Sequence, residues 1–328
     1  MKRIAVIGDG GWGTTVAILL EKKGYDVTLW GAFPEYIDLL KKERVNRKFL
    51  PGVRIPDGIK LISEVDNIPE DAIAIIAVPT KYLRDIIERF KGKITSGKII
   101  SLTKGIEVGT LKRPSEVISE VLGVNATSLS GPSISFEVAR NLPTTIVAAS
   151  SDEALAMETQ EIFTTPYFRV YSSKDLIGVE LGGALKNIIA IAAGISDGMG
   201  FGVNTKAALL TRGLVEIIRL GVKMGAKRET FFGLSGMGDL ATTCMSPHSR
   251  NRRFGEDIGK GKKLNGLLKE TGMVVEGVNT AESAHELSKK YKIDMPITEK
   301  IYEILRENKE PKEAVEELMG RALKAEEI

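Results

Sequence analysis

The sequence predicts an α/β protein, with a mostly parallel sheet in its N-terminal part and a second, all-α domain after it. Three observations lead to this prediction. Short apolar runs alternate with amphipathic segments through the first half of the chain, which is typical of a parallel sheet connected by helices. A cluster of glycines separates the first apolar run from the first amphipathic segment. Beyond about residue 174, helical periodicity dominates and strand-like runs disappear.

The strands of the first domain are predicted from short runs rich in Val, Ile, Ala and Thr. Residues 14–23 repeat apolar side chains at helical spacing and predict the first helix. The polar, proline-containing stretch 33–59 is expected to hold one helix and a loop. The predicted strands lie at 2–8, 26–30, 72–78, 98–103, 128–131, 144–150 and 168–173.

The second domain is expected to consist of helices separated by glycine-rich turns. The last helix is predicted over 311–323, where Pro311 occupies a favourable first helical position. A length of 328 residues suits two domains at about 100–200 residues each. We therefore predict domains at 1–175 and 176–328.

Composition narrows the class of protein. There are 46 Lys and Arg against 43 Asp and Glu, for a net charge of +3, so a dedicated nucleic-acid or anionic-membrane protein is disfavoured. A single Cys excludes an internal disulfide and favours a reducing compartment. The N-terminus lacks the pattern of a signal peptide, and the apolar stretch 185–195 is too short for the ~20 residues that a bilayer requires. We expect a cytoplasmic protein without stable membrane insertion and without a nucleic-acid partner.

Glycine is enriched, with 34 residues, and the first cluster is a motif. Gly8, Gly10 and Gly13 form G-x-G-x-x-G directly after the first strand and before the first helix. In that context the first Gly permits a tight turn, the second lets the backbone approach a pyrophosphate, and the third allows close packing of helix on strand. The N-terminus of the helix adds free N–H groups and a partial positive charge. The motif predicts that the first domain is of the Rossmann type and binds a dinucleotide.

The preference between NAD and NADP stays open in the sequence. Residues 30–33, at the end of the second strand, read WGAF. They include neither the acid that binds the ribose 2′-hydroxyl of NAD nor the Arg that accepts the 2′-phosphate of NADP. Phe33 is either a stacking partner for adenine or an exposed loop aromatic. Lys104, at the end of the fourth strand, either meets an anion or points to solvent.

Lys186 and Asn187 lie inside a long stretch of apolar and small residues, VELGGALKNIIAIAAGISDGMGFGVNT at 179–205. The small residues of this stretch predict a closely packed interior helix. A buried Lys is unfavourable unless it is paired or loses its proton, and desolvation would lower its pKa from about 10.4 toward the range of a general base. Lys186 is therefore a candidate base. The alternative is a lysine that extends into water from the edge of the helix.

The segment GLSGMGDLATTCMSPHSRNRRFG at 233–255 is a second candidate for the site. Its glycine-rich turn leads into Asp239, which is suited to orient a lysine or a substrate hydroxyl, and backbone N–H groups of such a turn can form an anion nest. Arg250 can hold a phosphate with its planar guanidinium, although SRNRR also fits a solvated, basic helix start. Cys244 and His248 are two potential ligands without others nearby, so no metal site is predicted.

A third candidate segment is MVVEGVNTAES at 273–283. Its acid, Glu276, follows two valines and precedes a glycine. Glu276 either reaches the cofactor or caps the following helix, and the spacing does not distinguish these two roles.

Seven segments spread over nearly the whole chain carry a shared pattern. They are GDGGWGTT (8–15), NRKFLPGVRIP (46–56), LTKGIE (102–107), SGPSISFEVA (130–139), ELGGALKNIIAIAAGISDGMGFGVNTKAAL (180–209), GLSGMGDLATTCMSPHSRNRRFG (233–255) and VVEGVNTAES (274–283). In this order and in these contexts, the chain resembles the bacterial NAD(P)-dependent glycerol-3-phosphate dehydrogenases. The KN and SRN segments are the most specific part of the resemblance.

The resemblance implies roles for individual residues. Lys186 matches the family's catalytic base, with Lys104, Asn187 and Asp239 as further catalytic candidates, and Thr243 matches a polar site position. Positions that match the family's substrate contacts are Lys104, Gly131, Ser133, Asp239, Ser249, Arg250 and Asn251. Positions that match its cofactor contacts are Gly11, Trp12, Lys104, Ser135, Arg250, Val274 and Glu276, beside the motif residues Gly8, Gly10 and Gly13 and the aromatic Phe33.

The activity that the resemblance implies is reversible hydride transfer between NAD(P)H and dihydroxyacetone phosphate. The product would be sn-glycerol 3-phosphate, a precursor of glycerophospholipids, and a homodimer is implied as well. The family often has His or Arg where this chain has Ala32, so either NAD or NADP is expected. It usually has Ala where this chain has Ser135, a small change that should preserve a backbone contact. Two alternatives are a two-domain β-hydroxyacid-type dehydrogenase that acts on a carboxylate and a non-catalytic NAD(P) sensor.

Overall fold

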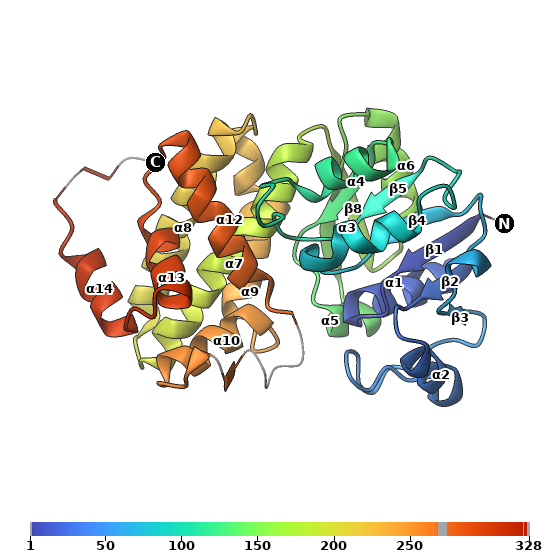
Figure 1. The fold of residues 1–328 in the computed structure, drawn as a ribbon, viewed down its shortest axis with the longest axis horizontal. Helices are drawn as coiled ribbons and strands as arrows, with labels where there is room; N and C mark the ends of the chain where they lie inside the picture. Colours follow the sequence, from blue (N-terminus) through green and yellow to red (C-terminus); the bar gives the residue numbers. More distant parts are fainter. Residues whose placement is uncertain (1, 265, 268–273, 324, 327–328) are drawn as a thin grey trace. The chain divides into compact units, whose positions relative to one another are not determined.

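The computed structural model describes residues 2–264, 266–267, 274–323 and 325–326. The chain divides into two compact units (Figure 1), one formed by Met1–Lys104 and Arg113–Leu176, the other by Gly105–Lys112 and Ile177–Ile328. The first unit is built on a sheet and the second on helices. This arrangement confirms the predicted fold class.

An eight-stranded sheet forms the centre of the first unit, in the order β3-β2-β1-β4-β5-β6-β7-β8. Neighbouring strands are parallel, except that β6 and β7 are antiparallel. The strands are β1 (Arg3–Ile7), β2 (Asp26–Trp30), β3 (Lys60–Ile62), β4 (Ile73–Ile76), β5 (Ile99–Ser101), β6 (Ala126–Ser130), β7 (Thr144–Ala149) and β8 (Phe168–Ser173).

The residues of β1 explain why the sheet is covered on both faces. Ile4 and Val6 belong to one apolar cluster, whereas Ala5 and Ile7 belong to another. Because successive side chains of a strand point to opposite faces, these clusters are two cores on the two sides of the sheet. All four side chains are completely buried. A strand buried on both faces has a continuous apolar sequence, and this is the pattern from which β1 was predicted.

The seven predicted strands are confirmed, and β3 is the strand that the sequence does not predict. β3 has only three residues and lies at the edge of the sheet, so it is too short to show a strand period. The polar stretch 33–59 holds the helix α2 (Pro34–Glu43), as predicted. The first helix, α1, begins at Gly11 rather than at residue 14, because the last glycine of the motif already lies in its first turn.

The other helices of the first unit follow the strands in the manner of a doubly covered sheet (Figure 1). They are α1 (Gly11–Lys22), α3 (Thr80–Arg89), α4 (Pro114–Leu122), α5 (Ser135–Ala139) and α6 (Glu153–Phe163), with a short 3₁₀ turn η1 (Val65–Asn67).

Among its described residues, the second unit contains helices and connecting loops but no strands, as predicted. Its last helix begins at Pro311, as expected, but ends at Met319 instead of continuing to residue 323. The elements are α7 (Leu176–Gly198), α8 (Val203–Lys223), η2 (Arg228–Phe232), η3 (Leu234–Gly238), α9 (Asp239–Met245), α10 (Arg250–Gly259), α12 (Glu276–Tyr291), α13 (Pro296–Arg306) and α14 (Pro311–Met319).

Helix α7 is longer than the apolar stretch seen in the sequence. With 23 residues it is long and apolar enough to cross a membrane by length and composition alone, so the expectation that the stretch is too short was wrong for the helix as a whole. However, 89% of its most apolar window is buried inside the protein. The core helix of a globular unit has this combination of features, and α7 supplies much of the apolar cluster of the second unit.

Helices α7 and α10 approach each other through glycines on both sides. A Cβ added at Gly194 or Gly198 of α7 would collide with carbonyl oxygens of α10, and a Cβ at Gly255 or Gly259 of α10 would collide with those of α7. In each helix the two glycines are four residues apart and therefore share one face. This close contact packs α10 along the C-terminal half of α7, directly after the turns that carry Lys186 and Asn187.

The segment Gly105–Lys112 belongs to the helical unit, although it falls within the range expected for the first domain. The reason is local packing. Ile106 is completely buried in the apolar cluster of the helices, and its carbonyl oxygen accepts a hydrogen bond of 3.1 Å from the Ser283 hydroxyl of α12.

The buried carboxylate of Glu216 makes stability depend on pH. Glu216 of α8 accepts hydrogen bonds from the first-turn N–H groups of α13, at 2.6 Å from Ile297 and 3.0 Å from Thr298. Burial raises the pKa of Glu216 from 4.5 to about 7, against the effect of these bonds. The folded state therefore keeps this proton over a pH range in which the unfolded state has lost it, and stability falls as pH rises from 4.5 through 7.

We expect the Glu216→Gln variant to lose this pH dependence. Between pH 4.5 and pH 8, the free energy of unfolding of the wild type should fall by about 3 kcal/mol relative to the variant. Urea unfolding at several pH values measures the difference. The exposed Glu286 of α12 provides the control, because Glu286→Gln should follow the wild type. Parallel curves for wild type and Glu216→Gln would contradict the prediction.

Candidate functional site

The three glycines of the motif have different surroundings. Gly8 has a φ of +118°, and a Cβ there would lie 2.6 Å from the Ala77 carbonyl oxygen. A Cβ at Gly13 would collide with the carbonyl of Gly8, whereas one at Gly10 would meet no atom within 4 Å. The turn is thus tightly packed at its first and third glycines and open at its second. This is the arrangement that a dinucleotide pyrophosphate needs, so the turn fits the predicted cofactor.

The Gly10→Ala variant is expected to fold normally and to lose dinucleotide affinity. The added methyl group has space in the protein but occupies the position of the pyrophosphate. Overpacking of this kind typically costs ~1–3 kcal/mol, so NADH should bind about 10- to 100-fold more weakly. Calorimetric titration with NADH measures the affinity, and urea unfolding measures the stability. Gly13→Ala should show the opposite pattern, with a stability loss of at least ~1–3 kcal/mol. Unchanged NADH affinity of Gly10→Ala would exclude Gly10 from the cofactor site.

Asn46, which no motif singles out by itself, fixes this turn. Its Nδ2 donates to the carbonyl oxygen of Asp9 and to the Thr14 hydroxyl, both at 2.8 Å. Its Oδ1 accepts from the Tyr36 hydroxyl at 2.6 Å and from the Phe49 N–H at 3.1 Å. Asn46 is completely buried. Asn46 is the first residue of the segment NRKFLPG, one of the segments on which the resemblance rests. Its place in that segment is the one feature of the sequence that could have pointed to it.

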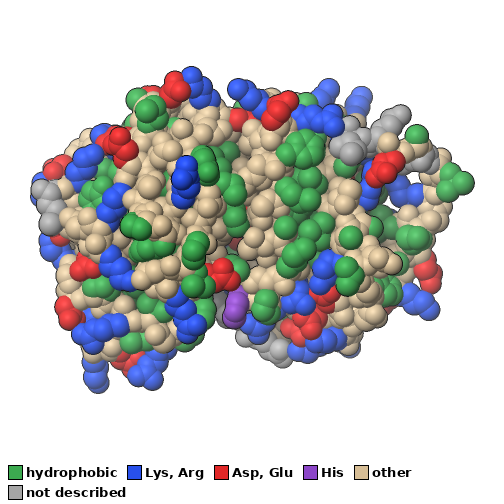
Figure 2. All heavy atoms as spheres, turned by 180° about the vertical axis from the view of Figure 1, so that it is seen from behind, with side chains coloured by type: hydrophobic (Ala, Val, Ile, Leu, Met, Phe, Trp, Pro, Cys, Tyr) green, Lys and Arg blue, Asp and Glu red, His purple; other side chains and the backbone are tan. Residues whose placement is uncertain are grey.

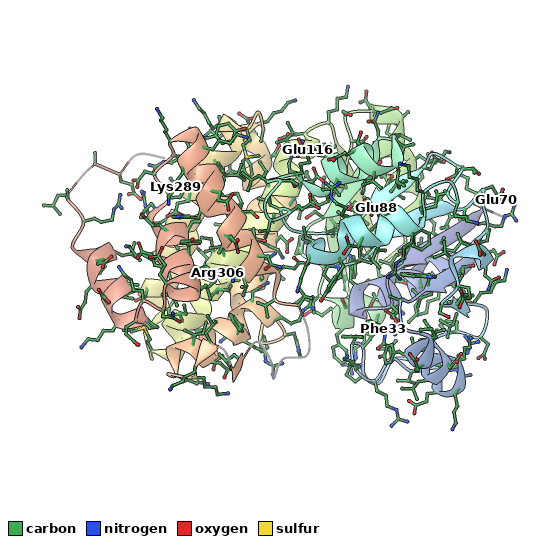
Figure 3. The ribbon with its side chains drawn as sticks, in the orientation of Figure 1. Phe33, Glu70, Glu88, Glu116, Lys289 and Arg306 are labelled. Atoms are coloured by element: carbon green, nitrogen blue, oxygen red, sulfur yellow. The ribbon has the colours of Figure 1, made fainter. Side chains whose placement is uncertain are left out.

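The other cofactor candidates of the first unit lie around the same turn. Gly11 starts α1 beside the Phe49 carbonyl, and the Trp12 ring packs on Phe168 with 6.3 Å between ring centroids. Ser135 starts α5, and its carbonyl accepts from the Thr15 hydroxyl of α1 at 3.2 Å. Phe33 is 67% exposed just before α2 (Figure 3), a position compatible with either of its expected roles.

Lys104, Gly131 and Ser133 form one polar group in the first unit. Lys104 Nζ donates to the Gly131 carbonyl at 3.0 Å, and the Ser133 hydroxyl donates to the same oxygen at 3.0 Å. Gly131 has a φ of +144°, which favours glycine. The structure therefore brings together three residues that the resemblance assigned to substrate binding.

Lys186, Asp239 and Thr243 form a buried cluster in the second unit. Lys186 Nζ lies 2.6 Å from Asp239 Oδ1 and 2.6 Å from Thr243 Oγ1. Lys186 and Asp239 are only 7% and 2% exposed, so the lysine does not extend into water. Its ammonium is stabilised by a carboxylate, as a buried charge requires. The Thr243 hydroxyl donates to the Asp239 carbonyl at 2.6 Å and is thereby oriented to accept from Lys186.

The glycine-rich turn before Asp239 differs from the expected anion nest. Leu234–Gly238 form a π-helical turn that continues into α9. The Gly238 N–H donates to the Gly233 carbonyl at 3.1 Å, and a Cβ at Gly236 would collide with the Phe231 carbonyl. Because the turn is packed against protein on this side, it places Asp239 at the start of α9 rather than offering an open nest. Turns of this kind are frequent at functional sites.

Asn187 and Asn251 form a second buried pair, directly beside Lys186. Asn251 Nδ2 donates to Asn187 Oδ1 at 2.8 Å, and Asn251 Oδ1 accepts from the Gly277 N–H at 2.9 Å. The pair thus joins α7, α10 and the first turn of α12. Gly277 must be glycine, because a Cβ would lie 2.7 Å from the Asn187 carbonyl oxygen. Gly277 was not predicted as a site residue.

The first turn of α10 carries the remaining candidates. Ser249 is the N-cap, and its hydroxyl accepts from the Arg252 N–H at 3.2 Å. Arg250 is exposed, and its guanidinium donates to the Val274 carbonyl at 3.3 Å. Glu276 is the first residue of α12, so its charge favours the start of that helix. Residue 273, the first of the MVVEGVNTAES segment, lies outside the described residues.

The comparison with known proteins identifies the family. Residues 3–156 match the family profile described as NAD-dependent glycerol-3-phosphate dehydrogenase N-terminus, and residues 175–316 match the corresponding C-terminus. The chain is 50% identical over 331 residues to a glycerol-3-phosphate dehydrogenase (NAD(P)+) of Geobacter sp. (strain M21), covering 99% of both chains. The chain belongs to the NAD-dependent glycerol-3-phosphate dehydrogenase family.

Other members of this glycerol-3-phosphate dehydrogenase family are similarly close. The enzyme of Geobacillus kaustophilus is 49% identical, over 99% of this chain and 96% of the relative. The crystal structure of glycerol-3-phosphate dehydrogenase from Coxiella burnetii matches with a TM-score of 0.93 at 39% identity, covering 98% of this chain and 99% of that one. These findings confirm the resemblance seen in the sequence, the class of enzyme and the NAD(P) class of cofactor.

The surface, the single cysteine and the potential metal ligands of this glycerol-3-phosphate dehydrogenase family member add three observations. On the face in Figure 2, Lys and Arg side chains are interspersed with Asp and Glu, so no single charge dominates that face. Burial raises the pKa of the Cys244 thiol to about 12, which keeps it protonated. Within the part of the chain that the structure describes, no three His, Cys, Asp or Glu residues gather as metal ligands would.

Proposed function

We propose that the chain catalyses reversible hydride transfer between NAD(P)H and C2 of dihydroxyacetone phosphate, giving sn-glycerol 3-phosphate as a precursor of glycerophospholipids. The observation that supports this function most strongly is the buried cluster of Lys186, Asp239 and Thr243. A ketone reduction needs a proton donor at the carbonyl oxygen, and a fixed ammonium group meets that need.

Lys186 is the proton donor and acceptor of the proposed mechanism. In reduction, its ammonium polarises the C2 carbonyl and gives a proton to the oxygen while C2 gains the hydride. In oxidation, neutral Lys186 removes the proton of the C2 hydroxyl. Asp239 and Thr243 orient the amine through their contacts of 2.6 Å, and Asn187 stands on the next position of the same helix.

The first unit holds the dinucleotide in this proposal. The open backbone at Gly10 and the start of α1 at Gly11 receive the pyrophosphate, with Trp12, Ser135 and Phe33 as neighbouring contacts. The bound nicotinamide supplies the hydride. Lys104, with Gly131 and Ser133 beside it, provides positive charge for an anionic substrate. From the second unit, Val274 and Glu276 are further candidates for cofactor contact.

Arg250 is the proposed anchor of the substrate phosphate. Its guanidinium can make paired, charge-assisted hydrogen bonds to phosphate oxygens. The N-terminus of α10, where Ser249, Arg250 and Asn251 lie, adds backbone N–H groups and a partial positive charge. An anchored phosphate fixes the position of C2. Binding of the phosphate thereby contributes to the rate of the chemical step.

Initial rates with dihydroxyacetone phosphate, in the presence of NADH and of NADPH, test the proposed function. Absorbance of the reduced nicotinamide should fall with this ketone and only slowly with small 3-keto acids. Faster turnover of a 3-keto acid would favour the β-hydroxyacid-type dehydrogenase instead. Tight cofactor binding without turnover of any ketone would favour the sensor. Cytoplasmic location and a homodimer also remain predictions, and sedimentation measures the second.

A further inference from the structure

The carboxylate of Asp9 lies at the end of β2, although Asp9 itself follows β1. Asp9 is the variable residue between Gly8 and Gly10 of the glycine motif. A Cβ added at Gly31 would lie 2.7 Å from Cγ of Asp9 and even closer to Oδ2. Gly31 directly follows the last residue of β2. The Asp9 carboxylate therefore occupies the space in which a side chain at residue 31 would begin.

This position is the one at which Rossmann-type domains usually distinguish NAD from NADP. An acid at the end of the second strand, about 20 residues after the glycines, binds the ribose 2′-hydroxyl of NAD. In this chain the residues at that position, Gly31, Ala32 and Phe33, carry no acid. Because β1 and β2 are parallel neighbours, with Ile7 opposite Trp30, a side chain that follows β1 can supply the carboxylate instead.

The environment of Asp9 leaves this carboxylate in need of a hydrogen-bond donor. Its Oδ2 atom is buried and accepts no hydrogen bond within the described residues. Burial raises the pKa of the Asp9 carboxyl, against a backbone hydrogen bond and the charge of Lys48. A buried carboxylate oxygen without a donor is unfavourable by itself. Asp9 as a whole is only partly buried, and a hydrogen bond to its carboxylate from a hydroxyl group of a bound ligand would offset part of that cost.

We propose that Asp9 selects NAD over NADP in this chain, by accepting a hydrogen bond from the ribose 2′-hydroxyl and by repelling a 2′-phosphate. The assignment rests on the proposed function, because it requires that the glycine motif holds a dinucleotide. A 2′-phosphate brings about two negative charges at pH 7, and a carboxylate in a region of low dielectric disfavours them strongly. Gly31 is also required for this selectivity, since any side chain at residue 31 would displace the Asp9 carboxylate.

The positive charge of Lys48 acts against a preference for NAD over NADP. Its ammonium attracts the Asp9 carboxylate and lies over the Phe49 ring, 5.0 Å from the ring centroid. If Lys48 determined the preference, a 2′-phosphate would be favoured. The sign of the preference therefore distinguishes the two residues.

Binding of two dinucleotide fragments without nicotinamide tests the proposal apart from catalysis. Calorimetry with ADP-ribose and with its 2′-phosphate gives the affinity ratio for the wild type, Asp9→Asn and Asp9→Ser. The wild type should bind ADP-ribose at least about tenfold more tightly, since a hydrogen bond to a charged group contributes that much. Both variants should lower the ratio about tenfold or more, with tighter binding of the phosphorylated fragment.

Asp71→Asn is the matched control, because Asp71 precedes β4 at the opposite, amino end of the parallel strands and is exposed beside Arg3. Its affinity ratio should equal that of the wild type. A wild-type preference for the 2′-phosphate, or equal ratios in the wild type and both Asp9 variants, would overturn the role of Asp9 while leaving the proposed function in place. Binding of neither fragment to the wild type would overturn the proposed function together with this assignment. Thermal unfolding verifies that each variant is folded.

Discussion

Turnover of dihydroxyacetone phosphate by a Lys186→Met variant is expected to fall about 10²- to 10⁴-fold, the range that a positioned acid–base group contributes. The methionine has a similar length but neither donates nor accepts the proton at the C2 oxygen. NADH affinity should stay within a few-fold of the wild type, because the glycine turn belongs to the other unit of the chain. Initial rates and NADH titration measure the two quantities.

Loss of stability is the competing explanation and has its own measurement. Removing one partner of a buried ion pair costs about 3–5 kcal/mol, and Lys186 lies 2.6 Å from Asp239. The double variant Lys186→Met/Asp239→Asn should recover part of that stability without recovering turnover. Lys300→Met is the control for loss of an enclosed lysine, since Lys300 pairs with Glu303 at 2.7 Å in α13. Turnover of Lys186→Met close to that of Lys300→Met would exclude Lys186 as the acid and base.

Most of the fold could be predicted because its signals are local. Each predicted strand is an apolar run whose meaning depends on a few neighbouring residues, and the glycine motif marks the first turn. β3 gave no such signal, because three residues at a sheet edge show no period. The antiparallel pairing of β7 with β6 depends on contacts between two separate segments of the chain. The local sequence pattern of a strand carries no information about its direction in the sheet. The full length of α7 was hidden as well, because polar residues interrupt its apolar stretch.

The site was predictable as a set of residues but not as a set of contacts. Lys186 could be recognised from its apolar neighbours, yet its partners Asp239 and Thr243 come from a different helix, more than 50 positions later. The same holds for Asn187, whose partner Asn251 is brought to it by the glycine contact of α7 and α10. Asp9 shows the converse case. A search for an acid at the end of β2 finds none, because the carboxylate comes from the turn after the neighbouring strand β1 and only the packing against Gly31 reveals it.

For an Arg250→Gln variant we expect the KM for dihydroxyacetone phosphate to rise about 10²-fold or more. Two charge-assisted hydrogen bonds from the guanidinium to the phosphate contribute about 1.5–3 kcal/mol each, and glutamine replaces neither the charge nor the paired geometry. Arg250 is exposed at the first turn of α10 and contacts the Val274 carbonyl through a single bond of 3.3 Å, so the variant should remain folded. Initial rates over a range of substrate concentrations give KM and kcat separately.

Arg253→Gln provides a matched control, because Arg253 is an exposed arginine one turn further along the same helix. It removes the same charge from the same unit, and its kinetic constants should equal those of the wild type. Dihydroxyacetone, which lacks the phosphate, provides the second comparison. The wild type and Arg253→Gln should prefer the phosphorylated ketone strongly, and Arg250→Gln should lose most of that preference. An unchanged preference in Arg250→Gln would show that the phosphate is held elsewhere, with Lys104 as the next candidate.

The division of the Arg250 effect between KM and kcat tells how the phosphate contributes to the reaction. The phosphate takes no part in bond making at C2, so contacts to it that are equal in ground state and transition state change KM alone. If the anchored phosphate also fixes C2 against the proton donor, part of the loss must appear in kcat, because a small displacement of the reacting carbon is costly. The Lys186 ammonium is held rigidly by two contacts of 2.6 Å and has little freedom to follow a displaced oxygen. A fall in kcat beside the rise in KM is therefore the expected form of the result.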